Sequence, residues 1–142
     1  EYLIFLNQVV QKEESAQEQN AVVPNERVEQ MLQYISKNLS HPLSLEEMEK
    51  QFFVSKYHIT REFKKYTGFT FHQYVMKKKL IYAKHLLREY RSSSAVYSKS
   101  GFSSYPHFLK AFKREFGITP KEFLKRDTQN QLIHYEHFED EQ

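Results

Sequence analysis

Two stretches of the chain place hydrogen-bonding and basic side chains on one side of a helix. The segment HITREFKKYTGFT, from residue 58, returns 49 residues later as HFLKAFKREFGIT. In the first copy, a helical wheel gathers four such side chains opposite the apolar ones: Tyr57, Thr60, Arg61 and Lys64. Arginine and threonine can bond to base edges in the major groove, and lysine suits phosphate. The pattern predicts a helix that reads duplex DNA.

The second copy keeps the basic residues but changes two of the residues that could contact bases. Pro106 and Leu109 stand where the first copy has tyrosine and threonine, while Lys110, Lys113 and Arg114 keep the charge. We therefore predict that the first copy carries more base specificity, and that the second adds charge and an apolar groove contact. Taken singly, each of these side chains is equally well explained as an ordinary solvated residue. Their recurrence at the same place favours contact with DNA.

Capping residues predict a helix-turn-helix unit over 44–67. Ser44 can cap one helix, with Glu47 completing a capping box. Ser55 can cap the second helix, and Gly68 suits its left-handed end. An earlier helix begins at residue 25 or 26.

The repeat predicts the same unit again at about 93–116. Ser104 is its cap, Gly117 its stop and Gly101 lies in its turn, and the offset pairs Phe53 with Phe102.

A long helix over 71–90 is expected to link the two units, because its apolar residues occupy much of the circumference. The serine-rich segment 91–100 predicts a helix that is short, or frayed until DNA binds, because serine competes for backbone hydrogen bonds. Only Val96 and Tyr97 look like anchors there. Pro120 marks a short final helix, and no segment reads as a strand, so the fold is expected to be all-α.

The basic charge is concentrated in the middle of the chain. Residues 1–24 carry a net charge of −3, residues 25–126 carry +11 and residues 127–142 carry −5, within an overall charge of +3. Such asymmetry indicates a polyanionic partner. A soluble lysine-rich surface explains the charge alone equally well.

Four segments follow from these patterns. Residues 1–11 are interpreted as a helix left from an upstream domain, and 12–25 as a linker. Residues 26–126 form the paired units, the first over about 26–70 and the second over about 91–126. Residues 127–142 form an acidic tail that is disordered, competes with DNA, contacts polymerase or docks as a short helix.

The motifs SLEEM, FVS, REFKKYTGFTFHQYV and AKHLL resemble the first half of the DNA-binding domain of AraC/XylS transcriptional regulators. GFSSYPHFLKAFKREFGITPKEF resembles its second half, and the similarity covers about 28–126. The resemblance implies about seven helices, with two helix-turn-helix units joined by a long helix and inserted into successive major-groove segments. It also implies a bacterial, cytoplasmic and nucleoid-associated regulator of promoter DNA, most often an activator that contacts RNA polymerase. A small-molecule effector or a homodimer contact would belong to an upstream domain.

Carried over residue by residue, the resemblance places recognition helices at 56–66 and 105–116. The base contacts are then Tyr57, Thr60, Arg61, Tyr105, His107, Leu109 and Lys110. The phosphate contacts are Lys56, Lys64, Lys65, Lys113 and Arg114. The chain departs from the family at Glu49, where a small residue is usual, and at Phe53, where glycine is frequent.

Other function classes find little support. The chain has no cysteine, which excludes thiol catalysis and cysteine-bound zinc, and its seven histidines form no recognised catalytic or metal site. We therefore expect no enzyme, cofactor or metal. His134 and His137 could bind a stray metal, but a solvated tail explains them better. No apolar run reaches the roughly 20 residues of a membrane span. RNA or protein binding by a basic helical module is the alternative, and a helix-turn-helix suits B-form DNA better than A-form RNA.

Overall fold

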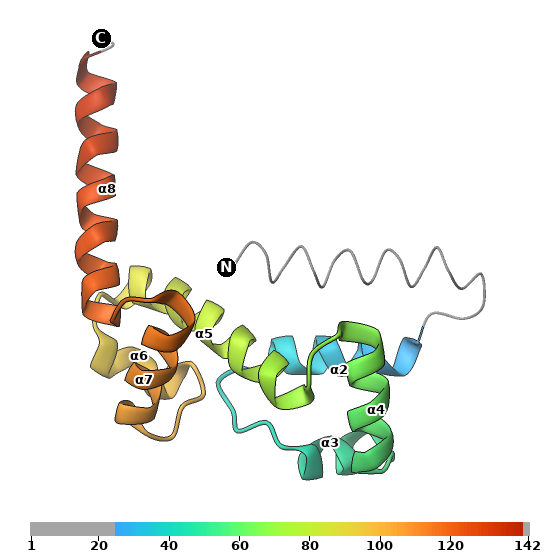
Figure 1. Ribbon diagram of the computed structural model, residues 1–142. Coiled ribbons are helices and arrows are strands. Elements are labelled where there is room, and N and C mark those ends of the chain that lie inside the picture. Colours follow the sequence, from blue (N-terminus) through green and yellow to red (C-terminus); the bar gives the residue numbers. More distant parts are fainter. Residues whose placement is uncertain (1–24, 141–142) are drawn as a thin grey trace.

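All regular secondary structure is helical among the residues that the structure, a computed structural model, describes: the backbone of 25–140 and the side chains of 25–132. Its helices are α2 (Glu26–Lys37), α3 (Leu45–Phe52), α4 (Lys56–Thr67), α5 (Phe71–Tyr90), α6 (Ser93–Lys99), α7 (Tyr105–Phe116) and α8 (Pro120–Asp140) (Figure 1). This confirms the all-α fold with a long helix between two helix-turn-helix units. The helix expected at 1–11 and the linker up to residue 24 lie outside the described residues.

The predicted caps fix where the recognition helices begin and end. The hydroxyls of Ser55 and Ser104 each accept a hydrogen bond from the backbone N–H three residues further on. Gly68 and Gly117 end α4 and α7 at φ values of 80° and 78°, in the left-handed region that glycine adopts without steric cost. These four residues set the length and the start of both helices.

The capping box predicted at the start of α3 is wrong in one half. Ser44 accepts from the N–H of Glu47 as expected, but the carboxylate of Glu47 accepts from the hydroxyl of Tyr34 at 2.8 Å. The tyrosine lies on α2, so the carboxylate ties α3 to α2 instead of closing its own helix end. A complete capping box forms at the start of α5, between Thr70 and Gln73.

Each unit has its own hydrophobic core, and α5 contributes to both. The core of the first unit contains Val28, Met31, Leu32, Ile35, Met48, Ile59, Phe63, Tyr66, Phe71, Tyr74 and Val75. The core of the second unit contains Leu80, Ala83, Leu86, Leu87, Val96, Phe102, Phe108, Phe112 and Phe123. The first part of α5 therefore serves one core and the rest serves the other, which explains why apolar residues surround much of this helix.

The turns of the two units are not equivalent at the offset of 49 residues. Phe53 has a φ of 55° and is 93% exposed, whereas Phe102 is 4% exposed and belongs to the second core. The residue of the second turn that shares the positive φ is Gly101, at 88°. Pairing Phe53 with Phe102 is therefore wrong, because the second turn contains one more residue before its cap. In the first turn, the N–H of Lys56 donates to the carboxylate of Glu49.

The helices α6 and α8 differ in how well they could be predicted from the sequence. The helix α6 has only seven residues and is anchored by the fully buried Val96, as expected. The short helix expected at Pro120 is wrong, because α8 runs for 21 residues to Asp140. No glycine or proline follows Pro120 in the sequence, so nothing local ends the helix. Asp127 also holds α8 through salt bridges to two arginines at the end of α5.

Candidate nucleic-acid interface

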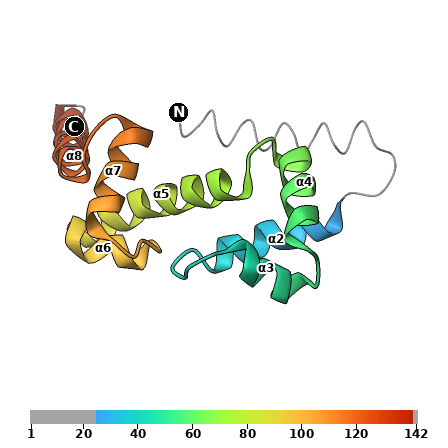
Figure 2. The same cartoon turned by 60° about the horizontal axis from the view of Figure 1, so that its bottom comes forward.

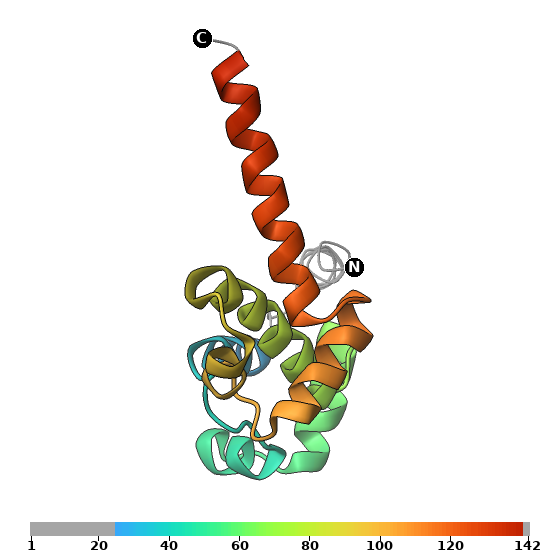
Figure 3. The ribbon, with the colours of Figure 1, turned by 90° about the vertical axis from the view of Figure 1, so that its left-hand side faces the viewer.

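The helices α4 and α7 lie at opposite ends of α5 and on the same side of the molecule. Figure 2 shows α5 running between them, and Figure 3 shows both on one side with α2 towards the other. The 20 residues of α5 span about 30 Å at the rise of an α-helix. This length is close to one turn of B-form DNA, about 34 Å.

The exposed side of α4 forms a continuous strip, which we call the first basic face. Its members are Lys56, Tyr57, Thr60, Arg61, Lys64 and Lys65, and all are exposed. Tyr57 has 73% of its surface exposed. The opposite side of the helix is buried through Ile59 and Phe63. The predicted division of α4 into an exposed polar side and a buried apolar side is therefore confirmed.

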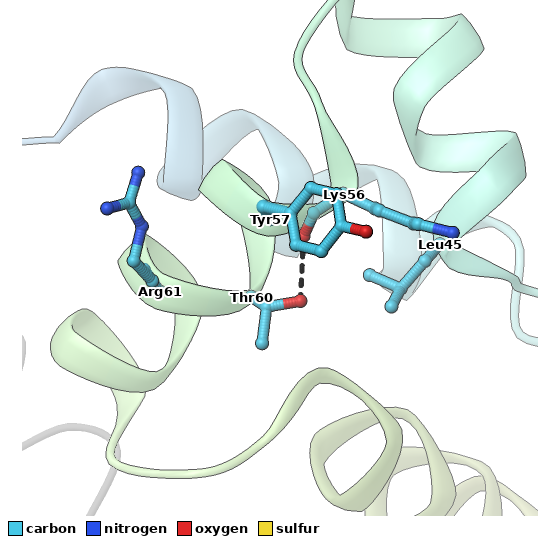
Figure 4. Close-up of a pocket in the computed structure, with 5 residues that line it drawn as sticks. All are labelled: Leu45, Lys56, Tyr57, Thr60 and Arg61. Atoms are coloured by element: carbon cyan, nitrogen blue, oxygen red, sulfur yellow. Dashed lines mark hydrogen bonds between the residues drawn. The ribbon is translucent and has the colours of Figure 1, made fainter.

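An open concavity lies on the first basic face, beside the start of α3. It is lined by Leu45, Lys56, Tyr57, Thr60 and Arg61 (Figure 4). The hydroxyl of Thr60 donates to the carbonyl of Lys56 at 2.7 Å, so its proton is already engaged. The threonine can still offer its methyl group and a lone pair to a base edge. In Figure 4, the side chain of Arg61 points away from Leu45, and Arg61 is an exposed residue.

The acidic residues of the recognition helices are turned towards internal partners. Glu62 on α4 accepts a hydrogen bond from Asn25 at 3.0 Å. Glu115 on α7 pairs with Lys77 of α5 at 2.7 Å. Within the described part of the chain, no ion pair engages the cations of the first basic face. The exposed side of α4 therefore presents a positive field to solvent, as phosphate binding requires.

The exposed side of α7, which we call the second basic face, is narrower. It comprises Pro106, His107, Lys110, Lys113 and Arg114. Leu109 is half-buried against the second core. Tyr105 is also half-buried, and its hydroxyl shares a 2.8 Å hydrogen bond with Ser93 at the start of α6.

The structure thus places ten of the twelve predicted DNA-contacting residues on exposed helix faces. The two exceptions, Tyr105 and Leu109, are held partly by the second core. The contacts themselves stay predictions. The burial of Lys79 between the two units was not predicted, because a run of three lysines is typical of a solvated surface.

Two other features, a metal site and a membrane span, were looked for among the described residues. No group of three or more metal-ligating side chains gathers among them. None of the helices described is both long and apolar enough to cross a membrane. The side chains of His134 and His137 lie outside the described ones.

The chain resembles known regulators over its paired units. A family model described as a helix-turn-helix domain matches residues 48–126. The regulatory protein PocR of Salmonella typhimurium is 30% identical over 105 residues, which cover 73% of this chain and 35% of PocR. The multiple antibiotic resistance protein MarA of Escherichia coli is 30% identical over 106 residues, covering 73% of this chain and 83% of MarA. The chain therefore spans about a third of PocR and most of MarA.

Solved structures share the fold. One of them is a transcriptional regulator from Chromobacterium violaceum that is described as containing an AraC-type DNA-binding domain. It superimposes on this chain with a TM-score of 0.65 and 28% identity. The match covers 71% of this chain and 91% of that structure.

Proposed function

Because the chain belongs to the AraC/XylS family of helix-turn-helix transcriptional regulators, we propose that it binds promoter DNA with both α4 and α7. The observation that carries the proposal is the pair of exposed basic faces at the two ends of α5 (Figure 2). The length of α5 suits two major-groove segments one helical turn apart. A basic helical module for RNA or protein has no comparable support.

The first basic face is proposed to read sequence. Arg61 is exposed, and a guanidinium can donate two bonds to guanine. Thr60 offers a methyl group for thymine or a lone pair for an amino group, because its proton is bonded to the backbone. Tyr57 is exposed enough to stack against a base or sugar. Lys56, Lys64 and Lys65 are proposed to bind phosphates.

The second basic face is proposed to contribute mainly charge. We propose that Lys110 and His107 contact base edges and that Lys113 and Arg114 contact phosphates. Leu109 and Tyr105 are half-buried against the second core, so each can offer only part of its side chain to DNA. The specificity of this half-site should therefore be lower than that of the first.

The whole protein is proposed to act in the bacterial cytoplasm, at the nucleoid, where it activates promoters through contact with RNA polymerase. An effector or a second copy would bind through a domain upstream of the paired units. These proposals rest on the family, since the chain spans only part of PocR.

Selection of bound sequences from a random pool of duplex DNA would supply a test duplex. Three single substitutions then test the proposed roles on that duplex. Arg61→Ala should cost about 1–3 kcal/mol of binding and relax the preference at one base pair. Lys64→Ala should weaken all duplexes alike and reduce the slope of log K against log salt by about 0.9. Lys37→Ala removes the same charge from α2, which lies towards the side opposite α4 and α7 in Figure 3, and should change neither the base preference nor the salt slope. Equal effects of all three would contradict the assignment.

Binding of RNA is tested by competition. Duplex RNA of the same sequence should fail to displace the DNA, because the deep, narrow major groove of A-form RNA does not admit a helix. Equal competition by RNA would favour the alternative of a basic module without sequence-specific reading of DNA.

A further inference from the structure

Lys79 joins the two helix-turn-helix units at the boundary between their cores. It lies on α5 between Val75, which belongs to the first core, and Leu80, which begins the second. Its ammonium group donates to the carbonyl of His41 at 2.9 Å and to the carbonyl of Gly101 at 3.0 Å. The first carbonyl belongs to the loop between α2 and α3, and the second to the turn between α6 and α7.

The two loops also approach each other directly. A Cβ atom added to Gly101 would lie 2.2 Å from the carbonyl oxygen of Leu39 and 2.6 Å from the ammonium nitrogen of Lys79. Only glycine fits between these groups at a φ of 88°. The turn of the second unit therefore packs against the loop of the first, with the lysine between them.

A buried ammonium group in this position is costly unless it is bonded. Lys79 is 5% exposed, and no other charged residue among the described ones is buried. Burial lowers the pKa of this lysine, and the nearby Glu47 partly opposes that effect. An apolar residue would avoid the desolvation cost, but it could not hold two carbonyl groups from different units. Lys79 therefore fixes the relative position of the two loops rather than adding apolar packing.

We propose that Lys79 is a positioning residue that locks the two units in one relative orientation and so sets the spacing of half-sites that the protein accepts. The link to half-site spacing rests on the proposed DNA binding, whereas the locking concerns the free protein alone. The salt bridge from Lys77 to Glu115 connects α5 to α7 and lies outside the contact between the two loops. It offers a matched control on the same helix.

The locking is tested by distances between the recognition helices in the free protein. The chain contains no cysteine, so Lys65→Cys and Lys113→Cys place one spin label on α4 and one on α7 without competing sites. Electron–electron double resonance should give one narrow distribution of the distance between the two labels. The same narrow distribution is expected when Lys77→Met is added to the labelled chain. Lys79→Met should broaden or split the distribution, with the helical circular dichroism retained. An unchanged distribution in Lys79→Met would overturn the proposal.

If Lys79→Met does not fold, ¹⁵N relaxation of the unsubstituted chain decides the question. Locked units tumble together, so the amides of 26–70 and 91–118 should fit one rotational diffusion tensor. Two separate tensors would overturn the locking.

The consequence for DNA is tested with the duplex recovered by selection and a copy with two base pairs inserted between its half-sites. The insertion rotates one half-site by about 70° around the duplex. The unsubstituted chain should lose at least about fivefold in affinity, the cost of one mismatched base pair. Lys79→Met should lose less affinity on this insertion. Lys77→Met should lose as much as the unsubstituted chain. If Lys79→Met lost as much affinity on the insertion as the unsubstituted chain, the role of Lys79 in half-site spacing would be overturned. Failure of the unsubstituted chain to bind either duplex would count against the proposed function, and the distance measurement would still judge the locking.

Discussion

The contact between the two loops predicts that two glycines with the same backbone conformation respond differently to alanine. Gly101 and Gly117 have φ values of 88° and 78°. A Cβ atom at Gly101 would lie 2.2 Å from the carbonyl oxygen of Leu39, whereas a Cβ atom at Gly117 would have no neighbour within 4 Å. The comparison therefore separates backbone strain, which both share, from the collision, which only one has.

The expected magnitudes follow from these two terms. Left-handed strain costs about 1–2 kcal/mol for alanine, and the loss of glycine's freedom in the unfolded chain returns about 0.4–1 kcal/mol. Gly117→Ala should therefore reduce the free energy of unfolding by about 1 kcal/mol. Gly101→Ala adds overpacking of about 1–3 kcal/mol. Displacing the ammonium group of Lys79 adds the weakening of a charged hydrogen bond, about 1.5–3 kcal/mol if lost outright. With about half of that hydrogen-bond energy lost, the total is about 3–5 kcal/mol.

Urea unfolding at 25 °C, followed by far-ultraviolet circular dichroism, measures both variants. With a slope of about 1–3 kcal/mol per molar urea, Gly101→Ala should lower the midpoint by more than about 1 M, and clearly more than Gly117→Ala does. The reasoning would be refuted if both variants had the same midpoint, because the loops would then have room for a side chain. A changed slope would indicate that the two units unfold separately.

Three further substitutions follow from local geometry. Phe53→Gly should raise the free energy of unfolding by about 0.5–1 kcal/mol, because it removes left-handed strain from an exposed residue; Phe53→Ala keeps the strain and should give no gain in the same urea assay. Tyr105→Phe should cost about 1 kcal/mol by removing the bond to Ser93, and DNA titration should show unchanged affinity because the ring remains. Asp127→Ala should cost at most about 1 kcal/mol, and hydrogen exchange should show faster amide exchange over 127–132, where α8 loses its salt bridges to α5.

The helices were predictable wherever local chemistry decides. Ser55, Ser104, Gly68 and Gly117 satisfy or end a helix through their own backbone and side chains, so their spacing alone gave the limits of α4 and α7. The basic faces were predictable for the same reason, because the period of an α-helix sorts buried from exposed positions.

Features that depend on distant partners were not predictable. Glu47 has the spacing of a capping box, but the hydroxyl of Tyr34 on α2 binds its carboxylate instead. The contact between α8 and α5 depends on salt bridges from Asp127 to Arg88 and Arg91, which are 36 or more residues away in the sequence. The burial of Lys79 depends on loops 60 residues apart in sequence meeting at one point. A helical wheel contains none of these long-range contacts.

The measurement that tests the central claim most directly is selection of bound sequences from a random duplex DNA pool at two salt concentrations. Binding by α4 and α7 together predicts a motif with two half-sites about 10 base pairs apart, better defined in the half read by α4. It also predicts a steep loss of affinity at the higher salt concentration. A motif confined to one half-site would contradict the double engagement. No enriched motif at either salt concentration would contradict sequence-specific binding by this chain.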